Sequence, residues 1–217
     1  MADKLRNLFL LSPRSKGFFA ALLLLAFAVS GHFLEHGWLG RGLYKFVMIF
    51  FPLAAGIELK RQFKIDRRGL IIAIASGIFL GAIAGTLIYF LLPHFANLSE
   101  LKNGFDSRYH YTTCTVIIAS LLIAGINSFL EEFFYRGFLD DRAGIPVSAF
   151  IFALQHVVVL WGLAGSLTVI LAGLIVFPAG ILWSLVRLRC GLISAWISHL
   201  LTDIFLLGIG LLLLGYI

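Results

Sequence analysis

Residues 115–141 read TVIIASLLIAGINSFLEEFFYRGFLDD, an apolar run that ends in adjacent carboxylates and an arginine. The apolar part is long enough to enter a membrane as a helix, and Glu131, Glu132 and Arg136 follow within the same run. Charged side chains are costly in hydrocarbon and tend to mark functional sites. This stretch therefore predicts a membrane helix that carries part of a buried polar site.

The composition of the whole chain favours a helical membrane protein with several spans. Of its 217 residues, 60% are hydrophobic and 13% are charged, and the mean hydropathy is +1.00. A soluble domain carries about 25% charged residues, and apolar runs long enough to cross a bilayer recur along this chain. We therefore expect an all-α transmembrane bundle that forms a single domain over residues 1–217.

Seven spans are expected from the apolar runs. Their predicted bounds are 17–34, 43–59, 70–92, 113–138, 146–163, 167–187 and 192–216. A break of the last run near Gly208 or Gly210 would give eight segments. Pro146 stands where the fifth helix would begin, a position that suits proline. The basic N-terminal segment and the apolar run after it look like a signal peptide, which we interpret as an uncleaved first helix.

The distribution of lysine and arginine predicts a cytoplasmic N-terminus. The cytoplasmic group would consist of Lys4, Arg6, Arg14, Lys16, Lys60, Arg61, Lys64, Arg67, Arg68, Arg136, Arg142, Arg187 and Arg189. The outer group would consist of Arg41, Lys45, Lys102 and Arg108. The net charge of +6 then reflects basic cytoplasmic loops, and no nucleic-acid partner is expected.

Ionisable residues on three expected helices lie at one depth in the inner half of the membrane. At a rise of about 1.5 Å per residue, Glu131 lies about 13 Å and His156 about 15 Å from the cytoplasmic ends of their spans. On the last span, His199 and Asp203 lie about 12 Å and about 18 Å from that end. Scattered loop residues would not coincide in this way, so a buried site is expected.

The spacing of these residues predicts specific contacts. Glu132 and Arg136 stand four apart, which is a favourable geometry for an ion pair on one helix face. His199 and Asp203 have the same spacing, so Asp203 can reach a ring nitrogen and fix the tautomer. Phe152 lies one helical turn before the histidine of the fifth span and is expected to wall the site.

The set Glu131, His156, His199 and Asp203 allows two kinds of chemistry. A carboxylate shielded from bulk water can act with a histidine to activate water for attack on a carbonyl. A second histidine or a neutral aspartic acid can then hydrogen-bond the oxyanion. The alternative is a divalent metal such as zinc, held by Glu131, His156 and His199, because histidines and carboxylates are typical zinc ligands.

Three ordered motifs resemble those of the CAAX-protease and bacteriocin-processing family, also called CPBP or Abi. EEFFYR at 131–136 resembles its EExxxR motif, FALQH at 152–156 its FxxxH motif, and HLLTD at 199–203 its third motif, HxxxN or HxxxD. The motifs occur in order on successive late helices. The resemblance covers about residues 113–208, which would be the catalytic core.

The resemblance implies an intramembrane endopeptidase with a glutamate-type mechanism. Glu131 and His156 would activate water, and His199 and Asp203 would support the oxyanion or the water. Glu132 and Arg136 of the EExxxR motif would pair with each other and hold the site together. Eukaryotic-type family members often have asparagine where this chain has Asp203, and an ionised aspartate cannot donate to an oxyanion. Asp203 is therefore expected to orient His199 or to stay protonated.

The expected activity is hydrolysis of a peptide bond near the cytoplasmic leaflet. The partners would be membrane lipids and a protein or peptide substrate, which is lipidated for eukaryotic family members. The compact chain and short loops favour a prokaryotic inner membrane. One alternative is a non-enzymatic membrane binding or immunity protein that retains the fold. A proton-coupled transporter is a further alternative, but its path would need polar residues through to the outer face.

Two further patterns have simpler interpretations. HFLEH, at residues 32–36, matches the HxxEH zinc-protease pattern, but no third ligand is evident at its depth. Gly77, Gly81 and Gly85 form a ridge of small residues on the third span, and such a ridge predicts close packing against another helix.

Overall fold

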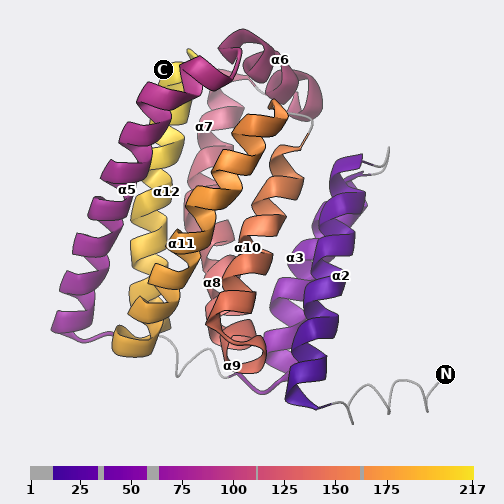
Figure 1. The fold of residues 1–217 in the computed structure, drawn as a ribbon, viewed down its shortest axis with the longest axis vertical. Coiled ribbons are helices and arrows are strands. Elements are labelled where there is room, and N and C mark those ends of the chain that lie inside the picture. Colours follow the sequence, from indigo (N-terminus) through magenta and orange to yellow (C-terminus); the bar gives the residue numbers. More distant parts are fainter. Residues whose placement is uncertain (1–11, 34–36, 58–63, 111, 162–163) are drawn as a thin grey trace.

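The helices of this chain run side by side along one axis of the molecule (Figure 1). The computed structural model describes residues 12–33, 37–57, 64–110, 112–161 and 164–217. Across these ranges it contains helices and no β-strand, which confirms the predicted all-α bundle.

The bounds of the helices follow the apolar runs closely. They are α2 (Pro13–Phe33), α3 (Gly37–Ala54), α5 (Arg67–Phe95), α6 (Leu98–Tyr109), α10 (Ile145–Leu160), α11 (Ser166–Cys190) and α12 (Leu192–Leu213). Between α6 and α10 lies one long helical run built from α7 (Thr113–Leu122), η1 (Ile123–Asn127), α8 (Ser128–Phe134), η2 (Tyr135–Leu139) and α9 (Asp140–Ala143). The segments η1 and η2 are π-helical.

Within the described residues, five helical segments are long and apolar enough to cross a membrane. They are Pro13–Gly31, Arg67–Phe95, Thr113–Ala143, Ser166–Cys190 and Leu192–Leu213. The other two predicted spans appear as the shorter apolar helices Gly42–Ala54 and Ile145–Leu160. The alternative of a break near Gly208 or Gly210 was wrong, because α12 continues unbroken to Leu213.

Two glycines make the tight turns that place the late helices next to one another. Gly144 joins α9 to α10 with φ of 86°, and Gly191 joins α11 to α12 with φ of 87°. Side chains with a Cβ rarely adopt such angles, so glycine permits each turn to be a single residue. Pro146 lies in the first turn of α10, as predicted.

The helices α5 and α12 pack closely along the predicted glycine ridge. A Cβ added at Gly77 would approach the backbone oxygen of Ser198 to 2.7 Å, and one at Gly81 would approach the Phe205 ring to 2.7 Å. Ser76 also donates a hydrogen bond to Ser198, with the two hydroxyl oxygens 2.9 Å apart. The small residues therefore hold α12, which carries one of the predicted motifs, against α5.

The polar stretch between α5 and α7 forms the short helix α6 at one end of the bundle (Figure 1). Asn97 caps its first turn by accepting hydrogen bonds from two backbone N–H groups. Lys102 on α6 lies 3.2 Å above the ring of Tyr216, and the Tyr216 hydroxyl hydrogen-bonds to Asp106. These contacts attach the segment after α12 to α6.

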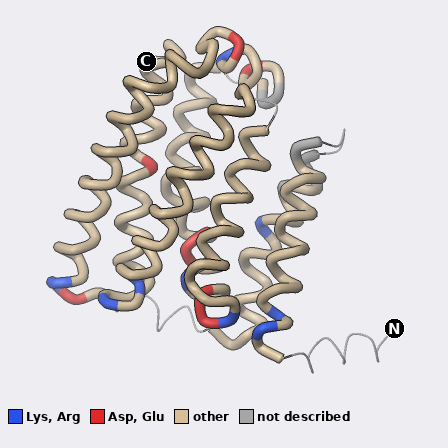
Figure 2. Tube along the Cα trace, in the orientation of Figure 1, with Lys and Arg blue, Asp and Glu red and all other residues tan. Residues whose placement is uncertain are grey.

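Charged residues gather at the end of the bundle where α2 begins and α11 ends (Figure 2). This distribution agrees with the predicted asymmetry, although the sequence analysis misplaced Lys45, whose ammonium hydrogen-bonds to Tyr44 beside Glu131. Arg136 is buried in its predicted pair with Glu132 and is therefore not a loop charge. Without these two residues the predicted groups still hold 12 cytoplasmic and 3 outer basic residues, so the expectation of a cytoplasmic N-terminus keeps its basis.

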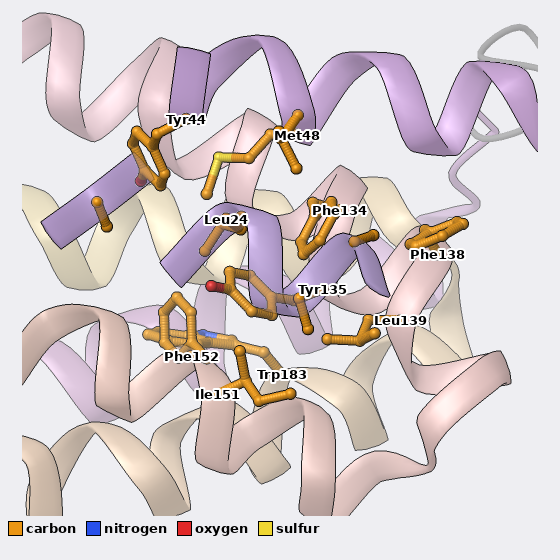
Figure 3. Close-up of a cluster of buried hydrophobic side chains, with 14 of the residues drawn as sticks. Leu24, Tyr44, Met48, Phe134, Tyr135, Phe138, Leu139, Ile151, Phe152 and Trp183 are labelled. Carbon is orange, nitrogen blue, oxygen red and sulfur yellow. The ribbon is translucent and has the colours of Figure 1, made fainter. Parts of the chain in front are cut away.

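A cluster of buried apolar side chains lies between α2, α3, the run 133–139, α10 and α11 (Figure 3). Its labelled members are Leu24, Tyr44, Met48, Phe134, Tyr135, Phe138, Leu139, Ile151, Phe152 and Trp183. Among them, Tyr44 contacts Glu131 of the predicted site, and Phe152 and Trp183 contact His199. The packed core and the site are therefore continuous.

Candidate active site

The two adjacent glutamates of the EEFFYR motif stand on α8, a short α-helical segment between two π-helical ones. A π turn widens the helix and frees backbone groups, and such turns frequently occur at functional sites. In η1, the carbonyl oxygen of Gly125 accepts a hydrogen bond from the indole of Trp196 on α12 (3.1 Å). This bond fixes the widened turn against the helix that carries the third motif.

Glu131 is buried, and its two carboxylate oxygens have different surroundings. Oε1 accepts hydrogen bonds from Asn127 Nδ2 (2.9 Å), Gln155 Nε2 (3.0 Å) and the Tyr44 hydroxyl (3.5 Å). Oε2 lies 3.8 Å from Nε2 of His199. Three donors on Oε1 fix the orientation of the carboxylate and turn Oε2 towards the histidine.

Gln155 is the centre of the network that holds Glu131. Its Nε2 donates to Glu131 and to the Tyr44 hydroxyl (2.7 Å), and its Oε1 accepts from the Tyr135 hydroxyl (2.5 Å). Lys45 also donates to the Tyr44 hydroxyl (3.1 Å). Both N–H groups and the carbonyl of the Gln155 amide are thus used, which fixes its orientation.

His199 is buried between carboxylates on three sides. Its Nδ1 lies 2.9 Å from Glu132 Oε1, and its Nε2 lies 3.5 Å from Asp203 Oδ1 and 3.8 Å from Glu131 Oε2. The indole of Trp183 stacks on the imidazole, with ring centroids 3.9 Å apart and planes at 18°. A ring with carboxylates at both nitrogens is arranged to donate from both, and the indole face favours a cationic ring.

The residue closest to His199 differs from the one that its spacing predicted. Asp203 reaches Nε2, as expected, but Glu132 makes the shorter contact at Nδ1. The side chain of Glu132 is fully buried, whereas that of Asp203 is 16% exposed. Glu132 therefore contributes most to the orientation of the ring, and Asp203 flanks the nitrogen that faces Glu131.

Glu132 and Arg136 form the predicted ion pair inside the bundle, with Oε2 and Nε 3.5 Å apart and both side chains at most 1% exposed. The guanidinium also donates from Nη2 to the carbonyl oxygen of Gly180 on α11 (3.2 Å). Its carbon lies 4.4 Å from the centre of the Phe152 ring, a cation–π contact. Arg136 thus links the second glutamate to α10 and α11.

His156 and Phe152 form the α10 side of the site. His156 Nδ1 lies 2.9 Å from the carbonyl oxygen of Phe152. A carbonyl oxygen can only accept, so Nδ1 carries a proton, and in the neutral ring Nε2 is then an acceptor. The Phe152 ring lies 4.5 Å from that of His156 and 5.8 Å from that of His199, which agrees with the predicted wall.

The described side chains do not form a ready metal site. Among them, no group of three or more histidine, cysteine, aspartate or glutamate residues is arranged to hold a metal ion. This includes the predicted set of Glu131, His156 and His199, of which His156 uses Nδ1 for a backbone carbonyl. The side chains of the alternative pattern HFLEH lie outside those that the structure describes, and its interpretation stays a prediction.

Sequence reasoning missed four residues of the site, namely Tyr44, Asn127, Gln155 and Trp183. Two of them had a local signal, because Asn127 stands four residues before Glu131 and Gln155 precedes the FxxxH histidine. Tyr44 on α3 and Trp183 on α11 reach the site only through packing of distant helices. No motif or spacing in the sequence indicates them.

The fold and the site together define an integral membrane protein with a buried centre formed by Glu131, Glu132 and His199. Residues 111–205 match the family model described as Rce1-like, type II CAAX prenyl endopeptidase. The match contains all three motifs and confirms the resemblance predicted from them. Searches of curated proteins and of solved structures found no match.

Proposed function

We propose that this protein is an intramembrane endopeptidase that hydrolyses a peptide bond of a membrane-associated protein or peptide near the cytoplasmic leaflet. The observation that carries the proposal is the buried Glu131 carboxylate, anchored through Oε1 and turned through Oε2 towards His199. The match of residues 111–205 to type II CAAX prenyl endopeptidases supports the same class of reaction.

In the proposed mechanism, Glu131 acts as the general base. A water molecule between Glu131 Oε2 and His156 Nε2 gives up a proton to the carboxylate as its oxygen attacks the carbonyl carbon of the scissile peptide. The anchoring of Oε1 prepares this step, because it keeps the working oxygen in one place before the substrate arrives. His156 contributes an acceptor at Nε2, since its Nδ1 proton is directed to the Phe152 carbonyl.

His199 is placed to stabilise the negative charge that the attack creates. Its Nε2–H group would donate a hydrogen bond to the oxyanion of the tetrahedral intermediate. Glu132 and Trp183 hold the ring in position for this hydrogen bond. The proton on Glu131 then passes to the leaving nitrogen as the C–N bond breaks. The products are a carboxylic acid and an amine, which leave as a carboxylate and an ammonium after one proton passes between them, and Glu131 returns to its ionised form.

The position of the site sets where the substrate would be cut. The site lies within the helices, towards the end of the bundle that carries most of the described charges (Figure 2). With the N-terminus in the cytoplasm, this is the cytoplasmic leaflet of what we propose to be a prokaryotic inner membrane. A lipidated peptide suits such a site because its acyl or prenyl chain would keep it at that leaflet.

The decisive experiment compares protein N-termini in membranes of cells that express the wild type or Glu131→Gln at equal levels. Glutamine keeps the shape and removes the base, so termini present only with the wild type would establish proteolysis and identify the substrate. Glu100→Gln, at an exposed position of α6, is the matched control and should behave as the wild type. Identical termini for wild type and Glu131→Gln, with both proteins inserted, would instead favour a non-enzymatic binding or immunity protein.

A further inference from the structure

The helix α3 contributes to the site although it lies outside the segment that matches the family model. Tyr44 on α3 is 7% exposed, and its hydroxyl lies within reach of Glu131 on α8 and Gln155 on α10. The next residue, Lys45, directs its ammonium to the same hydroxyl. Three helices therefore meet at one hydroxyl group, beside the proposed general base.

The donors and acceptors around the Tyr44 hydroxyl determine where its proton points. A tyrosine hydroxyl has one proton to donate and can accept from other donors. Gln155 Nε2 at 2.7 Å and Lys45 Nζ at 3.1 Å are both donors, so they occupy its acceptor positions. The proton is left for Oε1 of Glu131, 3.5 Å away.

We propose that Tyr44 is a positioning residue for Glu131. Together with Gln155, it holds Oε1 so that Oε2 stays turned towards His199 and the attacking water. Lys45 supports this by fixing the direction of the hydroxyl, and no described carboxylate lies within ion-pair distance of its ammonium. The inference rests on the proposed function and adds to it a part of the chain that no motif marks.

The proposal predicts a loss of turnover without a loss of substrate binding. At 3.5 Å the Tyr44–Glu131 contact is a long hydrogen bond, so we take the ordinary range of about 0.5–1.5 kcal/mol, which corresponds to about 2- to 12-fold in rate. Tyr44→Phe removes only the hydroxyl, so kcat should fall by this factor while KM stays within about twofold. Tyr89→Phe on the exposed face of α5 is the matched control and should leave both constants unchanged.

The assay uses purified full-length protein in detergent and an internally quenched peptide that carries a prenylated cysteine four residues from its C-terminus. Cleavage by the wild type and its loss in Glu131→Gln would support the proposed function independently of Tyr44. If Glu131→Gln is inactive and Tyr44→Phe keeps the wild-type kcat, only the present inference fails. A peptide that stays intact with the wild type, or is cut equally by Glu131→Gln, overturns both.

A double variant separates positioning from a general structural role. If Tyr44 acts through the Gln155 network, Tyr44→Phe should have little further effect in a Gln155→Leu background, whereas independent structural effects would add. Lys45→Met should lower kcat, and Lys45→Arg should restore most of it because arginine keeps the donor and the charge. A rise in KM with unchanged kcat in Lys45→Met would place Lys45 against the substrate and contradict the positioning role.

Discussion

The buried pair of Glu132 and Arg136 allows stability and catalysis to be tested separately. Replacing one member of a buried ion pair typically costs about 3–5 kcal/mol, because the other charge is left without a partner. Arg136 is 1% exposed, and its Nε and Nη1 already lack a hydrogen-bond partner, so its dependence on Glu132 is large. Glu132→Gln and Arg136→Met should therefore each lower the unfolding midpoint by about 6–20 °C.

The double variant Glu132→Leu with Arg136→Met should behave differently, since it removes both charges from the core. Apolar residues of similar volume often replace a buried pair at little cost, so the unfolding midpoint should return close to that of the wild type. Activity should not return, because His199 has lost its 2.9 Å partner at Nδ1. A loss of about 100- to 1,000-fold in kcat is expected, the range for a displaced oxyanion donor.

Two measurements on the same samples decide the matter, thermal unfolding in detergent and peptide cleavage. The pair of Arg187 and Asp141 is the control, because its side chains are 17% and 55% exposed. Water can solvate the remaining charge there, so replacing one member should cost less than in the buried pair. If the destabilisation of the two single variants simply adds in the double variant, Glu132 and Arg136 do not compensate each other's buried charge, and the reasoning is refuted. Recovered activity in the stable double variant would refute the role of Glu132 in holding His199.

Three further predictions follow from the packing around the site. Trp183→Leu should lower kcat by about 2- to 12-fold, the value of one ring contact with His199, while Trp183→Phe keeps most of the activity; equal rates for all three proteins would contradict the role of the stack. Gly77→Val should separate α5 from α12 and lower the unfolding midpoint, because its Cβ would meet the backbone oxygen of Ser198. Gly42→Ala places its Cβ in open space and should leave the midpoint unchanged, so thermal unfolding of both variants checks the prediction. Cleavage should persist after treatment with a metal chelator, because the described side chains form no three-residue metal site, and loss of activity restored by zinc would contradict this.

The fold could be predicted from the sequence because hydropathy acts locally. Each expected span corresponds to a helix, and the spacing of Glu132 and Arg136 correctly indicated a contact within one helix. The depth argument also brought Glu131 and His199 together from two helices, since the rise per residue is the same in each. These inferences need only the geometry of a single helix and a common membrane plane.

The contacts between helices were beyond such reasoning. Spacing paired His199 with Asp203, whereas the shorter contact comes from Glu132 on another helix. Lys45 was assigned to the outer group because the predicted topology puts the start of the second span on that side, whereas its ammonium hydrogen-bonds to Tyr44 beside the site. Helix rotation and neighbour choice decide these contacts, and both depend on the packing of the whole bundle.

The π-helical segments on either side of α8 also have a consequence for how one helix serves two environments. A helix of uniform pitch has a single phase, so the direction of Glu131 would also set which face of α7 packs inward. The wider turns of η1 and η2 shift that phase before and after the motif. The span can therefore present one face to lipid and neighbours along α7 and another to the reaction centre along α8. Removing a residue from η1 would restore a regular helix and rotate α8 relative to α7. The backbone would then be regular, but Glu131 would no longer point into the site.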